Sequence, residues 1–529
     1  MWLVLLLAAL PGWAQSIGAA VNESGVEVTY HVKTTGNNAN SGLTADLAVR
    51  TLATAVDKAK YGPLSQGKKT KIVVYPGTHT ENIWAVDWPG QGRGTVLIIE
   101  GTAPSQVTLK ASGGPILSIQ NKDNLVIRNL VFVGGAANGS LWGGRWSPFP
   151  AVREKQWLVS DCVFKESATD GARLQGLDNL TVQNCSFTNN QGAGLGFIGR
   201  YSKFVNLTLT GNGAPDDTPG LMFGGSHLVF DNITASDNRG AGIRHDWVGE
   251  DITITNSKFE RNGLQGMRFE ICLGPLLIKN CTVANNKKEA GLLLITVHNT
   301  TLDGCRFVDN AEAQVLIHPM NQRTTGDMEQ ADWEDKKAIT LVKNTKVTNS
   351  IFCVTQAGST AKIFKRLDET SYTEYIKWFQ TEYQGSNNKF TAPNNGAAAF
   401  DVSVGYFANQ RTYADLARWQ KDTGEDANST FSATCAGATA LPTTAAAELA
   451  GFSVYPNPAR DQLTLELPAG GEAAQLRVVD AAGRLVLRQA VPAGVRRHTL
   501  GLPTALAPGL YLLRLDQGSR HLSQRFARE

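Results

Sequence analysis

The chain has 529 residues, including 53 glycines, and its formal net charge is +3 with 18% charged residues. So balanced a charge gives no reason to expect a nucleic-acid partner, and we expect a monomer that binds none. The length alone would suit three or more domains, but a long repeat array is the case in which that estimate fails. Abundant glycine and few long helical patterns favour β-structure with many turns.

The chain begins with a short apolar run. Residues 2–10 are all apolar, and Gly12-Trp13-Ala14 follows them. This pattern predicts a signal peptide over residues 1–14, cleaved after Ala14, although no Lys or Arg precedes the run; a buried first strand is the alternative. No later run is apolar enough to span a bilayer. We therefore expect an exported protein, either secreted or attached to the cell surface.

One amphipathic helix is predicted near the start of the chain. Leu52, Ala55, Val56 and Ala59 recur at helical spacing and would form a single apolar stripe. The first coil of an open β-solenoid needs a cover that buries its apolar side chains and blocks edge pairing. We expect this helix to be that N-terminal cap.

From about residue 124 the sequence repeats with a unit of 22 to 26 residues. An asparagine marks the phase of the repeat, at Asn184, Asn206, Asn232, Asn256 and Asn280. Asparagine suits a sharp bend because it tolerates the left-handed backbone and can bond a stacked neighbour. Three short strands and three turns in such a unit make one rung of a parallel β-helix. The predicted fold is all-β: a right-handed parallel β-helix with caps over residues 25–435, then a small C-terminal β-sandwich.

Four cysteines share one phase of this repeat. We expect Cys162, Cys185, Cys281 and Cys305 to be small buried side chains stacked on one another. Neighbouring rungs are close enough for a disulfide, so the alternative of inter-rung bridges stays open.

One strand of each rung opens with glycine, and two consecutive copies are nearly the same. Residues 242–247 and 266–271 both begin Gly, apolar, Arg, any residue, acid. Strand alternation sends Arg244, Asp246, Arg268 and Glu270 to one face, and the residues between them to the other. The strands of one column stack into a flat sheet whose outward side is a suitable groove for an extended ligand.

Asp246 and Glu270 are the candidate catalytic residues. Equivalent side chains on stacked strands lie about 4.8 Å apart. Retaining glycosidases place their two carboxyl groups about 5–5.5 Å apart, whereas inverting ones need about 6.5–9.5 Å. The spacing therefore favours a retaining glycoside hydrolase, with one acid as nucleophile and the other as general acid. Arg244 and Arg268 would hold the carboxylates and offer donors to sugar hydroxyls or a uronate.

Other residues are expected to line further subsites for a polysaccharide or oligosaccharide. Arg173 and Gln175 lie on the near side of the pair, and His318 projects outward two rungs beyond Glu270. Trp142 and Trp146, in a glycine-rich insertion, would stack on a sugar face; the alternative is that they close over the side of the solenoid.

The end of the chain has a different composition. Residues 361–435 leave the repeat and are predicted to cap its far end, with a short helix that ends at Gly424. Residues 436–450 are rich in Ala, Thr, Pro and Gly and are predicted to be a linker. Residues 451–529 contain alternating strands and form the predicted sandwich.

Residues 451–529 also carry three motifs, in the order Tyr455-Pro456-Asn457-Pro458-Ala459, Asp480-Ala481-Ala482-Gly483-Arg484 and Pro508-Gly509-Leu510-Tyr511. In this order they resemble the C-terminal sorting domain of the type IX secretion system of Bacteroidetes. The resemblance implies export across the outer membrane through that machinery, followed by release or surface attachment.

A second resemblance concerns the candidate catalytic strands. Residues 242–247, then 266–271 and Gly274-Pro275, resemble a stretch of the two-domain β-helix β-xylosidases, within the broader group of pectate-lyase-like β-helix proteins. In that family the acids corresponding to Asp246 and Glu270 are the nucleophile and the acid/base. Arg244 stands where that family suggests an aromatic residue, and no second sandwich interrupts the helix, so the resemblance implies the reaction type more than the xyloside.

Three alternatives stay open at this point. In a polysaccharide lyase acting on a uronate polymer, Asp246 and Glu270 would hold Ca²⁺, and Arg268 or His245 would abstract a proton. A non-catalytic adhesin would bind carbohydrate through its aromatic loops. The arginines and acids could also form only an ionic ladder on an exposed sheet. No other cofactor or metal is predicted.

Overall fold

The structure is a computed structural model that describes residues 17–18, 20–88, 94–103, 105–136, 138–144, 154–214, 218–246, 248–318, 342–356, 358–366, 372–397, 399–401, 413–435, 453–455, 459–466, 473–479, 485–495, 497–503, 506–507, 509–517 and 520–528. The chain divides into two compact units, residues 1–436 and 437–529. Each is described by itself. The predicted signal peptide (1–14) and linker (436–450) lie outside the described residues. No helix among the described residues is long and apolar enough to cross a membrane.

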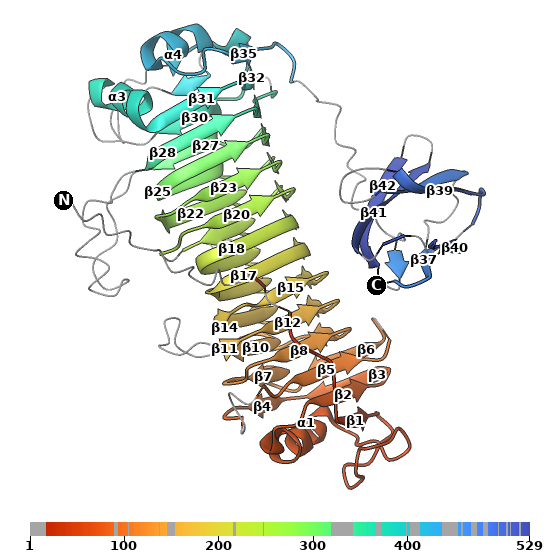
Figure 1. Ribbon diagram of the computed structural model, residues 1–529. Helices are drawn as coiled ribbons and strands as arrows, with labels where there is room; N and C mark the ends of the chain where they lie inside the picture. Colours follow the sequence, from red (N-terminus) through yellow and green to blue (C-terminus); the bar gives the residue numbers. More distant parts are fainter. Residues whose placement is uncertain are drawn as a thin grey trace, which may run out of the picture. The chain divides into compact units, whose positions relative to one another are not determined.

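The first unit is a parallel β-helix, as predicted, and its rungs stack in three columns (Figure 1). The column that carries the candidate site comprises β4 (Ile83–Ala85), β7 (Leu117–Ile119), β10 (Leu141–Gly144), β14 (Ala172–Asp178), β17 (Leu195–Thr210), β18 (Leu221–Ser236), β19 (Ile243–His245), β22 (Met267–Cys272), β25 (Ala290–Asp303), β27 (Ala313–His318), β30 (Lys362–Arg366) and β33 (Phe400–Asp401). We call it the site column.

The other two columns follow it around each rung, and β17, β18 and β25 turn corners between columns without a break. The second column comprises β1 (Val28–Val32), β2 (Thr70–Val74), β5 (Leu97–Gly101), β8 (Leu125–Arg128), β12 (Trp157–Ser160), β15 (Thr181–Gln183), β20 (Ile252–Thr255), β23 (Leu276–Lys279), β28 (Lys343–Thr348) and β31 (Tyr383–Ser386). The third comprises β3 (Gly77–Glu81), β6 (Val107–Ala111), β9 (Val131–Val133), β13 (Val163–Lys165), β16 (Ser186–Thr188), β21 (Lys258–Glu260), β24 (Thr282–Ala284), β26 (Arg306–Val308), β29 (Ile351–Cys353), β32 (Lys389–Thr391) and β35 (Thr430–Phe431). Two short strands, β11 (Glu154–Lys155) and β34 (Tyr413–Ala414), lie outside this scheme.

Like side chains stack on one another inside the helix. Phe132, Phe164 and Phe187 occupy the same position on three rungs, and their ring centroids are 4.7 and 4.9 Å apart. This spacing is the separation of neighbouring strands, so each ring covers the next and water is excluded from the interior.

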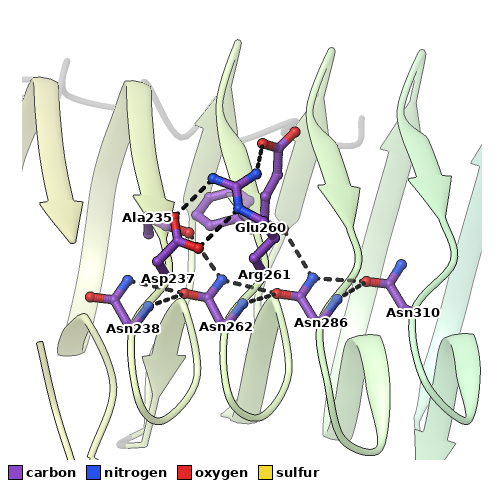
Figure 2. Close-up of polar contacts among 9 residues, drawn as sticks. Ala235, Asp237, Asn238, Glu260, Arg261, Asn262, Asn286 and Asn310 are labelled. Atoms are coloured by element: carbon purple, nitrogen blue, oxygen red, sulfur yellow. Dashed lines mark hydrogen bonds and ion pairs between the residues drawn. The ribbon is translucent and has the colours of Figure 1, made fainter. Parts of the chain in front are cut away.

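Two asparagine ladders form at the turns. The phase-marking asparagines Asn184, Asn206, Asn232, Asn256 and Asn280 all have φ between 53° and 56°, which confirms the predicted left-handed bend. The second ladder is buried: Asn238 Nδ2 donates to Asn262 Oδ1 (3.0 Å), and Asn262 Nδ2 donates in turn to Asn286 Oδ1 (2.9 Å), as Figure 2 shows. Each rung thus satisfies the buried amide of the rung before it.

The predicted N-terminal cap is α1 (Leu52–Tyr61), which is followed by η1 (Leu64–Gln66). The stripe of Leu52, Ala55, Val56 and Ala59 is buried in the core, as expected. Glu81 on β3 accepts hydrogen bonds from the first helical N–H groups, with 2.7 Å to the nitrogen of Leu52. A carboxylate at a helix N-terminus also interacts favourably with the helix dipole. Glu81 therefore binds the N-terminus of α1 to β3.

The far end is capped by α3 (Tyr372–Glu382), η3 (Asn394–Gly396) and α4 (Leu416–Thr423). The last of these helices ends at Gly424, as predicted, in the left-handed conformation. A disulfide joins Cys353 on β29 to Cys435, a pairing that the sequence analysis did not predict. The other five cysteines are free and buried, and they include the four at the shared phase of the repeat.

The second unit is a small sandwich of two antiparallel sheets, as predicted. One sheet contains β36 (Ser453–Tyr455), β37 (Gln462–Glu466) and β40 (Arg497–Gly501), and the other β38 (Ala474–Val479), β39 (Leu485–Val491), β41 (Gly509–Gln517) and β42 (Arg520–Arg528). Both sheets contribute to one buried cluster, in which Leu463 and Leu500 from the first pack with Leu476 and Leu513 from the second.

Candidate functional site

The two repeated strands, β19 and β22, lie side by side in the register that the sequence predicts. Arg244 pairs with Arg268, and His245 with Phe269. His245 and Phe269 are fully buried and point into the helix. Because side chains alternate along a strand, Arg244 and Arg268 lie on the outward face. Asp246 follows the end of β19, and Glu270 is the fourth residue of β22.

The structure brings the four predicted residues into one cluster, which we call the Arg244 cluster: Arg244, Asp246, Arg268 and Glu270. The Nη2 atom of Arg244 lies 3.0 Å from Asp246 Oδ2 and 3.6 Å from Glu270 Oε1. Arg268 forms a second ion pair with Glu270. Since both acids contact one nitrogen, their nearest oxygens are no farther apart than these two distances added together. This limit allows the retaining range of about 5–5.5 Å and also the lower end of the inverting range, about 6.5 Å.

The Arg244 cluster is only slightly open to solvent. The side chains are 13% exposed for Arg244, 12% for Asp246, 20% for Arg268 and 9% for Glu270. Charges in so enclosed a place are screened less by water and salt than surface charges are. The guanidinium groups therefore offset the cost of placing two carboxylates together.

His245 does not have the position that the lyase alternative required. Its side chain is fully buried on the inward face, and its Nδ1 lies 2.9 Å from the main-chain oxygen of Glu270. A side chain inside the helix cannot reach a proton on a substrate outside it, so His245 as the proton-abstracting base is wrong. Nor do the acids suit Ca²⁺, which takes six to eight oxygen ligands. Both acids are ion-paired to arginine, and the part of the chain that the structure describes contains no group of three metal-binding side chains.

His318 lies at the end of β27, two rungs beyond Glu270 in the same row of the site column. Its burial, and then the positive charge of Arg268, lower its pKa from the ordinary value. His318 is therefore neutral at neutral pH, and can both donate and accept a hydrogen bond.

Arg173 and Gln175 lie on β14, three rungs before the Arg244 cluster and about 14 Å from it at the usual strand spacing. The Nε atom of Arg173 donates to Asp170 Oδ2 at 2.7 Å. The rungs between carry Gly196 and Met222 in the same row, so no large charged side chain divides Arg173 from Arg244.

The aromatic residue exposed on the site column is not the one that the sequence suggested. Trp142 is part of β10 and is only 5% exposed, so the interpretation as an exposed loop platform is wrong for this residue, while Trp146 lies outside the described residues. Trp84 on β4 is 54% exposed, and it packs edge-on against Trp142 with 5.4 Å between ring centroids. Sequence analysis did not find Trp84 because β4 precedes the part of the chain in which the repeat is visible.

On the other side of the Arg244 cluster the outward face is apolar. Leu293 and Leu316 follow Arg268 in the same row, and both are buried, with exposures of 2% and 3%. They form a separate hydrophobic cluster with Ile295. Toward the N-terminal cap, the same row includes two exposed side chains, Arg173 at 39% and Trp84 at 54%.

Comparison with known proteins identifies both units. The family model of a right-handed β-helix region matches residues 151–307, and that of a secretion system C-terminal sorting domain matches residues 453–528. No curated protein matches the chain significantly.

Solved structures similar to the chain include the A-module of mannuronan C-5 epimerase AlgE6 from Azotobacter vinelandii, at 16% identity and a TM-score of 0.45, covering 73% of this chain and 95% of that chain. Pectate lyase Pel9A is 14% identical with a TM-score of 0.33, covering 66% and 82%. PorZ, a surface component of the type IX secretion system of Porphyromonas gingivalis, is 25% identical with a TM-score of 0.14, covering 16% and 12%.

The match to the β-helix family model agrees with the parallel stacking of the rungs in the first unit, and the match to the sorting domain covers most of the second unit. The sorting domain indicates secretion or attachment at the cell surface. The chain is a right-handed parallel β-helix protein that carries a C-terminal sorting domain for export.

Proposed function

We propose that the protein is a carbohydrate-active enzyme, and specifically a retaining glycoside hydrolase that acts on a polysaccharide or oligosaccharide. One observation supports this above all: Asp246 and Glu270, on consecutive rungs of an outward sheet, both lie against the Nη2 atom of Arg244, at 3.0 and 3.6 Å. This arrangement is compatible with the separation of about 5–5.5 Å at which two carboxyl groups act on one glycosidic bond without a water between them.

In the proposed reaction the Asp246 carboxylate attacks the anomeric carbon, and the bond to the leaving sugar breaks as Glu270 gives its proton to the glycosidic oxygen. A covalent glycosyl ester with Asp246 results. Glu270, now a carboxylate, takes a proton from water, which attacks the same carbon and releases Asp246 with retained configuration. Assigning Asp246 as nucleophile and Glu270 as acid/base follows the resemblance to the β-xylosidases.

The arginines have two tasks in this proposal. In the free protein they hold the carboxylates, and Arg268 forms an ion pair with Glu270. When substrate binds, its hydroxyl or carboxylate groups take over the donors of Arg268. Glu270 is then free to carry the proton that the leaving group needs.

The remaining residues of the site column define where further sugars would lie. Arg173 and Gln175 would contact sugars on the N-terminal side of the Arg244 cluster, and Trp84 would stack on a sugar farther along the same face. His318 would contact the sugar on the C-terminal side. The row of these residues runs along the helix axis, so the proposed substrate is an extended chain.

The test is to incubate the full-length protein with a panel of plant and algal polysaccharides, beside Asp246→Asn, Glu270→Gln and the control Asp237→Asn. New reducing ends with retained anomeric configuration by NMR, lost in the first two variants and kept in the control, would establish the hydrolase. Ultraviolet absorbance from an unsaturated uronate would instead identify a lyase. A changed sugar composition without cleavage would identify an epimerase, and binding without turnover an adhesin.

A further inference from the structure

One inward row of the site column contains a single histidine among phenylalanines. Phe197, Phe223, His245 and Phe269 occupy equivalent positions on four consecutive rungs and are at most 1% exposed. The ring centroids of His245 lie 5.2 Å from Phe223 and 6.2 Å from Phe269. A phenyl ring fits this stack on both sides, so apolar packing does not explain an imidazole here.

The imidazole makes a polar contact that a phenyl ring cannot make. His245 Nδ1 lies 2.9 Å from the main-chain oxygen of Glu270. A carbonyl oxygen only accepts hydrogen bonds, so Nδ1 must carry the proton and act as the donor. Burying a polar ring costs free energy unless it is hydrogen-bonded, and this bond offsets that cost.

The carbonyl of Glu270 belongs to an irregular piece of strand. Ile271, the next residue, has φ +53°, which is unusual for a β-branched side chain. On one side, Glu270 and Cys272 pair with Ile295 and Val297, and Thr296 between these two is also left-handed. On the side of β19, Gly249 pairs with Cys272. Gly249 is three residues after Asp246, whereas Cys272 is only two residues after Glu270, so the β19 side has one extra residue.

This irregularity has two parts. The strands β22 and β25 share a left-handed bend at Ile271 and Thr296 and keep equal residue counts, whereas the extra residue, and so the β-bulge, lies on the Asp246 side. Such irregularities interrupt the regular ladder and change the direction of a side chain, and strain of this kind is kept where the surroundings fix it. Two contacts fasten the bend from the neighbouring rung: Gly249 N donates to Ile271 O at 3.2 Å, and His245 donates to Glu270 O. Gly249 also leaves room for the imidazole, because a Cβ atom there would lie 2.5 Å from His245 Nε2.

We propose that His245 is a positioning residue, which holds the main chain of Glu270 at the start of the left-handed bend so that its carboxylate stays beside Asp246 and Arg244. This inference rests on the proposed function in assigning Glu270 as the acid/base. His245 touches no substrate; it acts only through the peptide oxygen of Glu270.

Two substitutions separate the ring from the donor. His245→Phe keeps the aromatic stack, as its neighbours do, and removes the donor. His245→Asn keeps an N–H donor near the position of Nδ1 and removes the ring. We expect His245→Phe to have a melting temperature equal to that of the wild type or higher, with impaired acid catalysis. We expect His245→Asn to melt at a lower temperature but to retain more activity.

The nature of the leaving group gives a readout that a purely structural role would not change. A sugar leaving group needs the proton of Glu270, whereas 4-nitrophenolate leaves without it. For His245→Phe we expect kcat/KM on the cleaved polysaccharide of the panel to fall about 10²-fold, as for a 1 Å misplacement, and on the 4-nitrophenyl glycoside of the same sugar to fall less than about threefold. Equal losses on both substrates, or activity that follows the melting temperature in both variants, would overturn the proposal.

A second measurement does not depend on turnover. Crystal structures of the wild type and both variants would show whether the Glu270 carboxylate leaves Arg244. We expect it to move in His245→Phe and to stay in His245→Asn; an unmoved carboxylate in His245→Phe would overturn the inference even if the protein proves to be a lyase or an adhesin. If the carboxylate moves as expected but the wild type cleaves nothing, the proposed hydrolase fails while the positioning role stands.

Discussion

Neighbouring rungs carry two clusters of arginine and carboxylate that differ in geometry and in exposure to solvent. One is the Arg244 cluster on the site column. The other, which we call the Arg261 cluster, lies at the turns of the third column, where Arg261 contacts Asp237 of the previous rung and Glu260 of its own (Figure 2). In both clusters an arginine connects acids that belong to consecutive rungs.

Geometry and solvent separate the two. Arg261 forms a two-bond fork with Asp237, at 2.9 Å from Nε to Oδ1 and 2.8 Å from Nη2 to Oδ2, and both side chains are nearly half exposed. This bonding raises the pKa of Arg261, so the pair is satisfied as it stands. In the Arg244 cluster the arginines and both acids are enclosed and one nitrogen contacts both acids, whereas in the Arg261 cluster only Glu260 is enclosed, with 12% of its side chain exposed. The comparison shows that the burial of the whole cluster, rather than the presence of an ion pair, distinguishes the functional candidate.

The sharpest way to test this comparison is to remove the charge of matched acids. Asp246→Asn or Glu270→Gln should lower kcat/KM by about 10²–10⁴-fold, the usual contribution of a positioned acid or base. Asp237→Asn, on the rung before that of Asp246 and in the Arg261 cluster, should leave the rate unchanged. The measurement is reducing-end release by the three variants at equal folded concentration. An equal loss in all three would mean that the variants damage the fold, and no loss in any would return Asp246 and Glu270 to a structural ladder.

Removing the arginines should reveal the difference in stability. Arg244→Leu leaves two enclosed carboxylates close together without their shared partner, and breaking such a pair costs about 3–5 kcal/mol. Arg261→Leu removes the exposed pair with Asp237, worth less than about 1 kcal/mol, and leaves one enclosed carboxylate, Glu260, instead of two, so it should cost less than Arg244→Leu. Urea denaturation monitored by circular dichroism gives both free energies of unfolding. If Arg261→Leu were the more destabilising, exposure would not be the property that separates the clusters.

The two asparagine ladders allow the same comparison between a buried and an exposed set of contacts, with uncharged side chains. Asn262→Ala leaves the buried amides of Asn238 and Asn286 without one partner each, and we expect a loss of about 2–3 kcal/mol from unsatisfied buried groups. Asn206→Ala interrupts the exposed ladder and removes a side chain suited to φ 55°, so we expect about 1 kcal/mol. The measurement is the free energy of unfolding of the two variants at one common temperature, obtained from thermal unfolding. Equal losses would show that burial of an asparagine ladder does not increase its contribution to stability.

The repeat made the fold predictable. Once the asparagines fixed the phase, strand alternation placed Arg244 and Arg268 in register and sent His245 inward, because register and face follow from counting residues along equivalent rungs. The helix stripe of the N-terminal cap and the end of the last cap at Gly424 followed from local rules of the same kind.

What the sequence could not supply depends on irregular or distant contacts. The left-handed bend at Ile271 breaks the period-two count, and no local residue preference predicts a left-handed isoleucine. The Cys353–Cys435 disulfide joins residues 82 apart, and the segment between them includes both the last strands of the columns and the helices of the C-terminal cap. For Trp142, an exposed sugar platform and closure over the side of the solenoid were both open; it is part of a strand and packs against Trp84. Exposure of a tryptophan depends on its neighbours on adjacent rungs, which only the three-dimensional stacking reveals.

Substitution of Trp84 is expected to have the smallest effect on activity, and it tests how far along the site column the substrate extends. Its indole N–H donates to Asn82 Oδ1 at 3.1 Å and Trp142 packs against it, so the ring is held with more than half of its surface open. It lies six rungs from Arg244 in the same row, about 29 Å at the usual spacing. Only a long chain can contact both places. Trp84→Ala should therefore raise KM for the cleaved polysaccharide about tenfold, the loss of one aromatic stacking contact of about 1–1.5 kcal/mol, with kcat unchanged.

Short substrates make that prediction decisive. A trisaccharide bound at the Arg244 cluster cannot reach Trp84, so its KM should be the same in Trp84→Ala and in the wild type. Tyr61→Ala is the matched control, since Tyr61 is an aromatic side chain that is 70% exposed on α1 and outside the site column. Its loss should change neither constant. If KM for the trisaccharide rises as much as KM for the polymer, Trp84 acts through the fold instead of through the sugar. If neither rises, the substrate does not extend along the axis toward the N-terminal cap, and the binding face is confined to the rungs next to Arg244.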